Sequence, residues 1–147
     1  MARLRTACGI FGLVLAWLAL ASSSTASDGG FIVIVHPDNP VSTVDSDFVR
    51  DAFLKKATRW SHGPKIRPID LAGDLRAHDR FTHDVLKKTP AQLRAYWVQR
   101  IFSGTDVPPP AVDSPANVIA YVVANPGTLG YLPSGVNPGH AKVVTIK

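Results

Sequence analysis

The 147-residue chain has no glutamate and only one cysteine, Cys8. Because Cys8 lies near the N-terminus, ahead of an apolar run, the rest of the chain has no thiol for a disulfide, a nucleophile or a thiolate metal site. The sequence also lacks a long run of one charge, since its 16 Lys and Arg and its 11 Asp alternate along it. This pattern is typical of a solvated surface, and it predicts no nucleic-acid partner.

The first 26 residues have the features of an export signal. Arg3 and Arg5 form a positive n-region, and the apolar run at residues 10–21 follows. That run is short for a membrane span, which needs about 20 residues. We therefore expect a signal peptide cleaved after Ala26, with an uncleaved membrane anchor as the alternative. No later stretch is long and apolar enough to span a bilayer, so we expect a periplasmic protein with no stable membrane insertion after cleavage.

Cleavage would leave a chain of single-domain size. Residues 27–147 number 147 minus 26, or 121, and carry 14 Lys and Arg against 11 Asp, a net charge of +3. A chain of this length can bury a core of its own. The small positive charge predicts a mild preference for anions.

Apolar runs and helix signals alternate along these residues. Four strands are predicted, at residues 31–35, 66–71, 128–132 and 141–146. Four helices are predicted, at residues 45–54, 74–86, 89–102 and 114–124. The first strand is apolar on both faces and should be central, whereas Pro68 places the second near an edge. The order favours an α/β fold, a single three-layer αβα lobe with a mostly parallel sheet of about four strands.

The helix at residues 89–102 has the clearest signals. Thr89 is the expected N-cap, Pro90 the first helical residue, and Gln92 completes a capping box. Its expected buried face comprises Leu93, Tyr96, Trp97, Ile101 and Phe102. In the helix before it, the inward positions are expected to be Leu75, Phe81, Val85 and Leu86.

Several short motifs follow one another in a fixed order. They are Asp51-Ala-Phe-Leu54, Arg59-Trp60 followed by Gly63, Tyr96-Trp97 with Ile101-Phe102 and Gly104, a proline-rich connector at 107–110, and Pro126-Gly-Thr-Leu-Gly-Tyr131. Together they resemble one lobe of the phosphate-type substrate-binding proteins of bacterial ABC transporters. The resemblance covers residues 31–147. It implies a periplasmic-binding-protein-like domain at 27–147, capture of phosphate or another small anion, and a membrane transporter or sensor as partner.

The chain departs from that family where phosphate is held. Full-length members close two lobes on the anion, whereas this chain has residues for one. Asp70 stands where the family has an Arg, and Leu-Ala-Gly-Asp-Leu-Arg follows at 71–76 in place of Ser-Gly-Thr. Lys55 stands where the family often has a Gly that closes the first helix. A carboxylate at the pocket would repel phosphate, so the alternative function is a periplasmic protein-interaction module that has lost its ligand.

One anion site is nevertheless predicted. Arg76 and Arg80 lie four residues apart near a helix start, where free N–H groups and the helix dipole attract anions, and Lys65 or Arg67 could complete the site. The alternative is that Arg80 pairs with Asp84 and Arg76 is solvated.

Other chemistry has little support in the sequence. His78, Asp79, His83 and Asp84 invite a metal site, but only Asp79 and His83 share a helix face, and two ligands are too few. No Gly-x-Ser-x-Gly turn, paired carboxylates or glycine-rich phosphate loop is present. We therefore predict no metal, no cofactor and no enzymatic activity.

Overall fold

The computed structural model describes residues 30–147. The predicted signal peptide and its cleavage after Ala26 lie outside the described residues and stay predictions. Cys8 also lies outside them. Within residues 30–147, none of the helices has both the length and the hydropathy needed to cross a membrane.

The main sheet has five strands rather than the four predicted. They are β1 (Phe31–Val35), β2 (Thr43–Val44), β3 (Arg67–Pro68), β6 (Thr128–Pro133) and β7 (Lys142–Ile146). Their spatial order is β2-β7-β1-β6-β3. The apolar β1 is therefore central and β3, with Pro68, is an edge strand, as predicted. The additional strand β2 has only two residues, too few to show a strand pattern in the sequence.

The strand directions are mixed, which corrects the prediction of a mostly parallel sheet. β1 runs antiparallel to both of its neighbours, β6 and β7. The outer pairs β2–β7 and β3–β6 are parallel. Counting alternating strands and helices could not show this, because β1 lies between two strands from the other end of the chain. The α/β class and the layered arrangement are confirmed.

A second, two-stranded sheet branches from β3. The predicted strand at 66–71 is divided into β3 and β4 (Asp70–Leu71), and β4 pairs in parallel with β5 (Ala111–Val112). Ile69 lies at the transition, and its N–H still donates to Leu129 O at 2.9 Å. The next N–H, that of Asp70, donates to Pro110 O instead. The chain thus leaves the main sheet within one residue, and Asp70 stands at the branch point.

Four helices form where they were predicted. They are α1 (Ser46–Phe53), α2 (Leu75–Asp84), α3 (Pro90–Phe102) and α4 (Pro115–Ala124). Thr89 and Gln92 form the predicted capping box of α3, and Ser114 caps α4 through Asn117 N. Asp45 occupies the N-cap position of α1 but makes no side-chain cap bond there.

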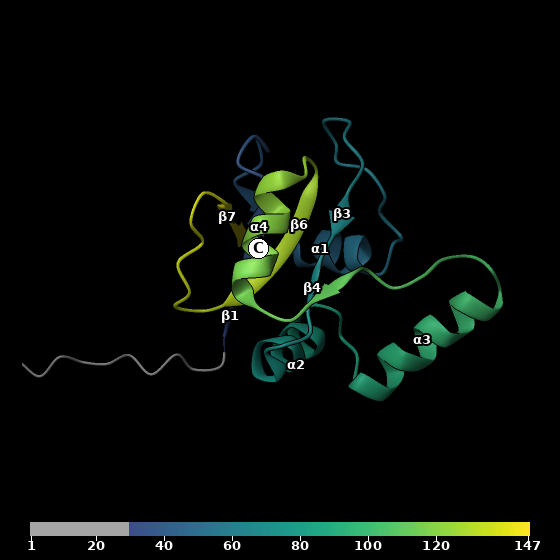
Figure 1. The fold of residues 1–147 in the computed structure, drawn as a ribbon. Coiled ribbons are helices and arrows are strands. Elements are labelled where there is room, and N and C mark those ends of the chain that lie inside the picture. Colours follow the sequence, from purple (N-terminus) through teal and green to yellow (C-terminus); the bar gives the residue numbers. More distant parts are fainter. Residues whose placement is uncertain (1–29) are drawn as a thin grey trace, which may run out of the picture.

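The helices cover the sheet from two sides (Figure 1). α4 packs closely on β6, since a Cβ added to Gly130 would lie 3.1 Å from Val118. On the opposite face, the Phe81 ring of α2 stacks on Tyr131 of β6 with centroids 4.0 Å apart. Phe53 of α1 meets Phe81 edge-on at 4.7 Å. This aromatic cluster forms the core between the sheet and the helices α1 and α2.

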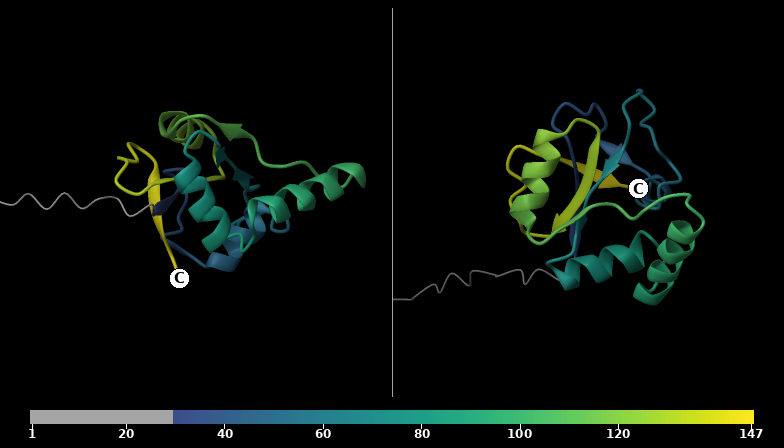
Figure 2. Two further views of the ribbon diagram at one scale, coloured as in Figure 1. Left: turned by 90° about the horizontal axis from the view of Figure 1, so that it is seen from below. Right: turned by 45° about the vertical axis from the view of Figure 1, so that its right-hand side comes forward.

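α3 packs with only the N-terminal part of the face that was predicted, since Leu93 and Tyr96 are half-buried. Trp97 is buried, as expected, but Ile101 and Phe102 are 51% and 87% exposed. Leu75, expected to face inward from α2, is 72% exposed. Figure 2 shows α3 standing away from the sheet. The helix therefore buries only a narrow strip around Trp97 and leaves its C-terminal end uncovered.

Candidate functional site

Basic side chains gather around one cavity beside the edge strand β3. The cavity has a volume of about 390 Å³, and its basic lining residues are Lys55, Lys65 and Arg67, opposite a single acidic residue, Asp106. The rest of the lining comes from α1, the segment after it, β3, Pro110 and Tyr121 of α4. We call this site the basic cavity. Its excess of positive charge and its size suit a small anion.

Lys55 reaches the basic cavity because of the way α1 ends. Its φ of 56° places it in the left-handed region, and its N–H donates to Ala52 O at 3.1 Å. This is the position at which a glycine commonly closes a helix. The lysine adopts the costlier conformation, and its Nζ bonds Asp106 Oδ1 at 3.1 Å, across 51 residues of sequence.

Asp106 is the one negative group at the basic cavity. Partial burial by itself would raise the pKa of Asp106, but hydrogen bonds from the Val107 N–H and from Lys55 outweigh it and hold the pKa below its ordinary value. The carboxylate therefore stays charged at neutral pH and partly neutralises Lys55. The cationic side chains Lys65 and Arg67 form no ion pair within the part of the chain that the structure describes.

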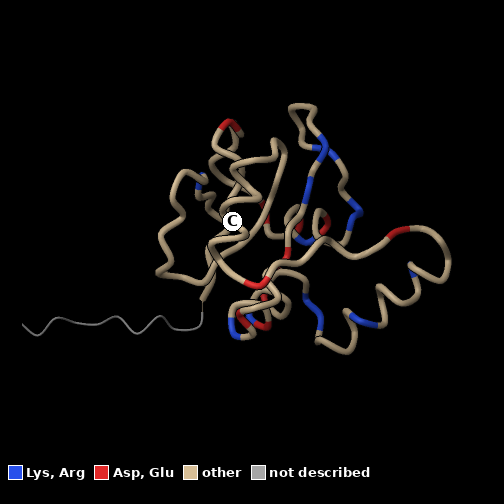
Figure 3. The backbone as a smooth tube through the Cα atoms, viewed as in Figure 1, with Lys and Arg blue, Asp and Glu red and all other residues tan. Residues whose placement is uncertain are grey.

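The structure brings together two of the four predicted anion-binding residues. Lys65 and Arg67 both line the basic cavity, whereas Arg76 and Arg80 lie on α2 and do not. Figure 3 shows the basic positions of segment 55–67 apart from those on α2. Arg80 Nε pairs with Asp84 Oδ2 at 2.9 Å, and Arg76 is exposed. Lys55 was not predicted as a site residue, although its place at a position that favours glycine was a signal.

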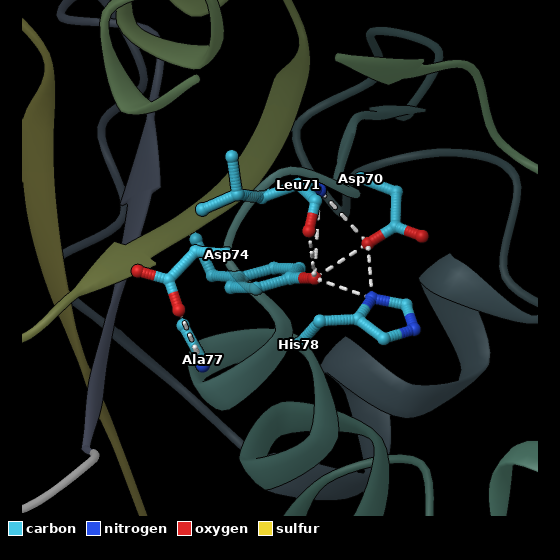
Figure 4. Close-up of polar contacts among 6 residues, drawn as sticks. Asp70, Leu71, Asp74, Ala77 and His78 are labelled. Carbon is cyan, nitrogen blue, oxygen red and sulfur yellow. Dashed lines mark hydrogen bonds and ion pairs between the residues drawn. The ribbon is translucent and has the colours of Figure 1, made fainter. Parts of the chain in front are cut away.

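A second polar cluster lies at Asp70, the residue that departs from the family pattern. Figure 4 shows the Asp70 carboxylate beside the side chain of His78. Tyr131 Oη donates to Asp70 Oδ1 at 2.5 Å, and His78 Nδ1 lies 3.2 Å from the same oxygen. The Leu71 N–H also donates to it, at 2.9 Å. These hydrogen bonds satisfy the Asp70 carboxylate within the protein. The neighbouring cavity of about 20 Å³ holds about one water at most, so it has no room for phosphate.

The charges of this cluster follow from its geometry. Burial would raise the pKa of Asp70, but the hydrogen bonds from His78 and Tyr131 outweigh it, and the pKa is lowered. The hydrogen bond to Asp70 raises the pKa of His78 against the opposing effect of burial. Burial, together with the charge of Asp70, raises the pKa of Tyr131, so its hydroxyl stays protonated and donates. Asp70 and His78 therefore form an ion pair at mildly acidic pH.

The Asp70–His78 pair predicts a pH-dependent stability. The pKa of His78 is raised from 6.5, so its contribution is full below 6.5 and is lost as pH rises through the folded-state value. The pKa of Asp70 is lowered from 3.8, so its contribution is present above 3.8 and is lost as pH falls through the folded-state value. We expect the difference in unfolding free energy between wild type and His78→Gln to be largest at pH 4–6.5 and to shrink toward pH 8, as measured by urea denaturation.

His83→Gln is the matched control for this pH experiment. His83 lies on the same helix and contacts Asp84 at 2.8 Å, but its side chain is 83% exposed. Its replacement should change stability little at any pH. A His78→Gln difference that stays constant from pH 5 to 8 would contradict the ion pair.

The residues considered for a metal site do not converge. His78 bonds Asp70, and His83 bonds Asp84. Among residues 30–147, no group of three or more His, Cys, Asp or Glu side chains is arranged to hold a metal ion.

Solved structures share this fold. An ABC-type phosphate transport receptor from Vibrio cholerae matches 80% of this chain and 46% of its own, with a TM-score of 0.60 and 16% identity. PstS from Borrelia burgdorferi matches 80% of this chain and 47% of its own, with a TM-score of 0.55 and 14% identity. No sequence family and no curated protein matches the chain. The resemblance seen in the sequence is therefore confirmed at the level of the fold.

The match is partial. The chain spans less than half the length of these two proteins. The TM-scores show a shared fold, and sequence identities of 16% and 14% are too low to assign the ligand of either protein to this chain. The Vibrio cholerae neighbour is a transport receptor rather than an enzyme.

Proposed function

We propose that this chain is an exported solute-binding-like module of the periplasm that captures a small oxyanion, such as phosphate, in the basic cavity. The observation that supports this most is the convergence of Lys55, Lys65 and Arg67 on one cavity with a single opposing carboxylate. A membrane transporter or sensor would receive the anion. The shared fold with phosphate transport receptors supports the solute-binding class. No enzymatic role is proposed.

The affinity should be low. Lys65 and Arg67 are exposed, and two charges about 4 Å apart in water attract one another by only about 1 kcal/mol. Asp106 opposes the anion from within the same cavity. We therefore expect a dissociation constant for phosphate of about 1 mM, or about −4 kcal/mol.

Titration of the protein with phosphate, followed by NMR at constant ionic strength, tests this proposal. A chain that begins at Ser27 is suitable, because every buried apolar residue of the described part lies between Val33 and Val144. Arg67→Gln should weaken binding about fivefold, the loss of one solvent-screened charge. Asp106→Asn should strengthen binding by a similar factor, because it removes the only opposing charge and frees Lys55.

Arg80→Gln is the matched control for this titration. It removes the same charge from α2, where Arg80 pairs with Asp84 outside the basic cavity. Its phosphate affinity should equal that of the wild type. If Arg80→Gln weakens binding and Arg67→Gln does not, the anion binds at α2 and the basic cavity is the wrong site.

A protein-interaction module without a ligand is the second candidate. It is favoured by the Asp70 cluster, in which the position of the family's Arg carries a carboxylate saturated by Tyr131 and His78. Absence of any phosphate-induced shift at 20 times the expected dissociation constant would favour this candidate.

A further inference from the structure

α3 has an apolar face that no other part of the described structure covers. Val98, Ile101 and Phe102 are 46%, 51% and 87% exposed, and Arg94 is exposed beside them. The four positions are spaced i, i+4, i+7 and i+8, so they share one side of the helix. We call them the outward strip. Three apolar side chains adjoining one another at the end of a projecting helix differ from apolar residues scattered singly over a surface.

An adjoining side of α3 packs against the body of the protein. Trp97 is 8% exposed and borders the small cavity beside Phe53 and Leu86. Tyr96 Oη donates to Leu54 O at 2.8 Å, which ties the middle of α3 to the end of α1. The exposure of the outward strip is therefore a consequence of which face of α3 packs.

The charged residues of α3 and of the segment just before it are all basic. Residues 86–105 contain Lys87, Lys88, Arg94 and Arg100 and no acidic residue. Arg94 is the basic residue of the strip itself, whereas the side chains of Lys88 and Arg100 lie over the Tyr96 ring on the packed side of α3, 5.4 and 4.9 Å from its centroid. The helix and the residues before it thus combine aromatic and aliphatic side chains with positive charge, which is the composition of helices that bind at the surface of anionic membranes.

We propose that the outward strip docks on an anionic lipid surface, with Phe102 and Ile101 inserted at the boundary between headgroups and acyl chains. Attraction between the basic residues and anionic headgroups would add to the burial of the apolar side chains. A second copy of the chain fits less well, because it would bring the same positive charges against the strip. This inference is independent of anion binding in the basic cavity.

Co-sedimentation with lipid vesicles tests the proposal, using the chain that begins at Ser27 so that the apolar run at residues 10–21 is not present. The wild type should bind vesicles of equal parts phosphatidylglycerol and phosphatidylcholine, and bind pure phosphatidylcholine at least about fivefold more weakly. Phe102→Ser should weaken binding to the mixed vesicles about tenfold, and Arg94→Gln about fivefold. Raising the salt concentration should weaken binding of the wild type.

Leu75→Ser is the matched control, since Leu75 is 72% exposed on α2 and is not part of the outward strip. Its vesicle binding should equal that of the wild type. Because Leu75 and Phe102 are both exposed, neither substitution should unfold the protein, and a difference in binding between the variants would not be caused by unfolding. No binding to the mixed vesicles, or equal binding by the wild type and Phe102→Ser, would overturn the proposal. A dimer in light scattering that Phe102→Ser dissociates, together with no vesicle binding, would assign the strip to a second copy instead.

Discussion

Phe81→Ala is expected to lower the free energy of unfolding by about 3–5 kcal/mol, the usual cost of removing a large core ring. Phe81 is 1% exposed and stacks on Tyr131 at 4.0 Å with an interplanar angle of 7°. Phe31 and Phe53 meet the same ring edge-on, at 5.3 and 4.7 Å. The residue therefore joins α1, α2 and the two central strands, so its cavity would be surrounded by elements that cannot all collapse into it.

Phe102→Ala is the control for this substitution, because it deletes the same ring from an 87% exposed position. Its effect should lie within about 0.5 kcal/mol of zero. Urea denaturation followed by circular dichroism measures both variants. An equal loss of stability in the two would mean that the end of α3 is packed against the body, which is the arrangement that the sequence predicts and the structure contradicts.

Sequence reasoning succeeded where the signal is local. The capping box of Thr89 and Gln92 and the Ser114 cap need only residues three apart, and both helices begin where these residues place them. The central position of β1 follows from its apolar faces, and the edge position of β3 follows from Pro68. The short motifs added the resemblance to phosphate-binding proteins, which the shared fold confirms.

The predictions that were wrong concern contacts between segments that lie far apart in the sequence. The apolar positions of α3 continue to its C-terminal end, and its sequence alone does not indicate that packing stops before Ile101 and Phe102. The direction of β1 relative to β6 and β7 depends on which strands become neighbours. In the same way, the hydrogen bond between Tyr131 and Asp70 joins residues 61 positions apart, so the sequence showed the carboxylate but not its partner.

The candidate site was predicted in part for the same reason. Lys65 and Arg67 were named as anion ligands and do line one cavity, but as partners of Lys55 rather than of Arg76 and Arg80. The ion pair of Arg80 with Asp84 spans one helical turn and was foreseen as the alternative. Lys55 reaches the basic cavity because it adopts a left-handed backbone conformation at the end of α1. A lysine in the sequence does not by itself predict that conformation.

Gly127→Ala is expected to cost about 2–5 kcal/mol and to weaken phosphate binding as well. A Cβ at this position would lie 2.2 Å from Lys65 O, and the φ of 82° is in the left-handed region. The left-handed backbone conformation costs about 1–2 kcal/mol for alanine, and the steric clash costs about 1–3 kcal/mol. Gly127 O also accepts hydrogen bonds from Trp60 Nε1 at 3.0 Å and from Arg67 N at 3.1 Å.

Relief of that clash would push β3 away from the turn before β6, and Lys65 and Arg67 would move with it. Gly104→Ala is the control, since Gly104 has a φ of 66° but no atom within 4 Å of an added Cβ. It should lose only the conformational part, about 1–2 kcal/mol, and keep the phosphate affinity of the wild type. Urea denaturation and the NMR titration on both variants separate the two effects. Equal losses of stability, with unchanged affinity in both, would mean that the close approach of Gly127 to Lys65 does not position the basic cavity.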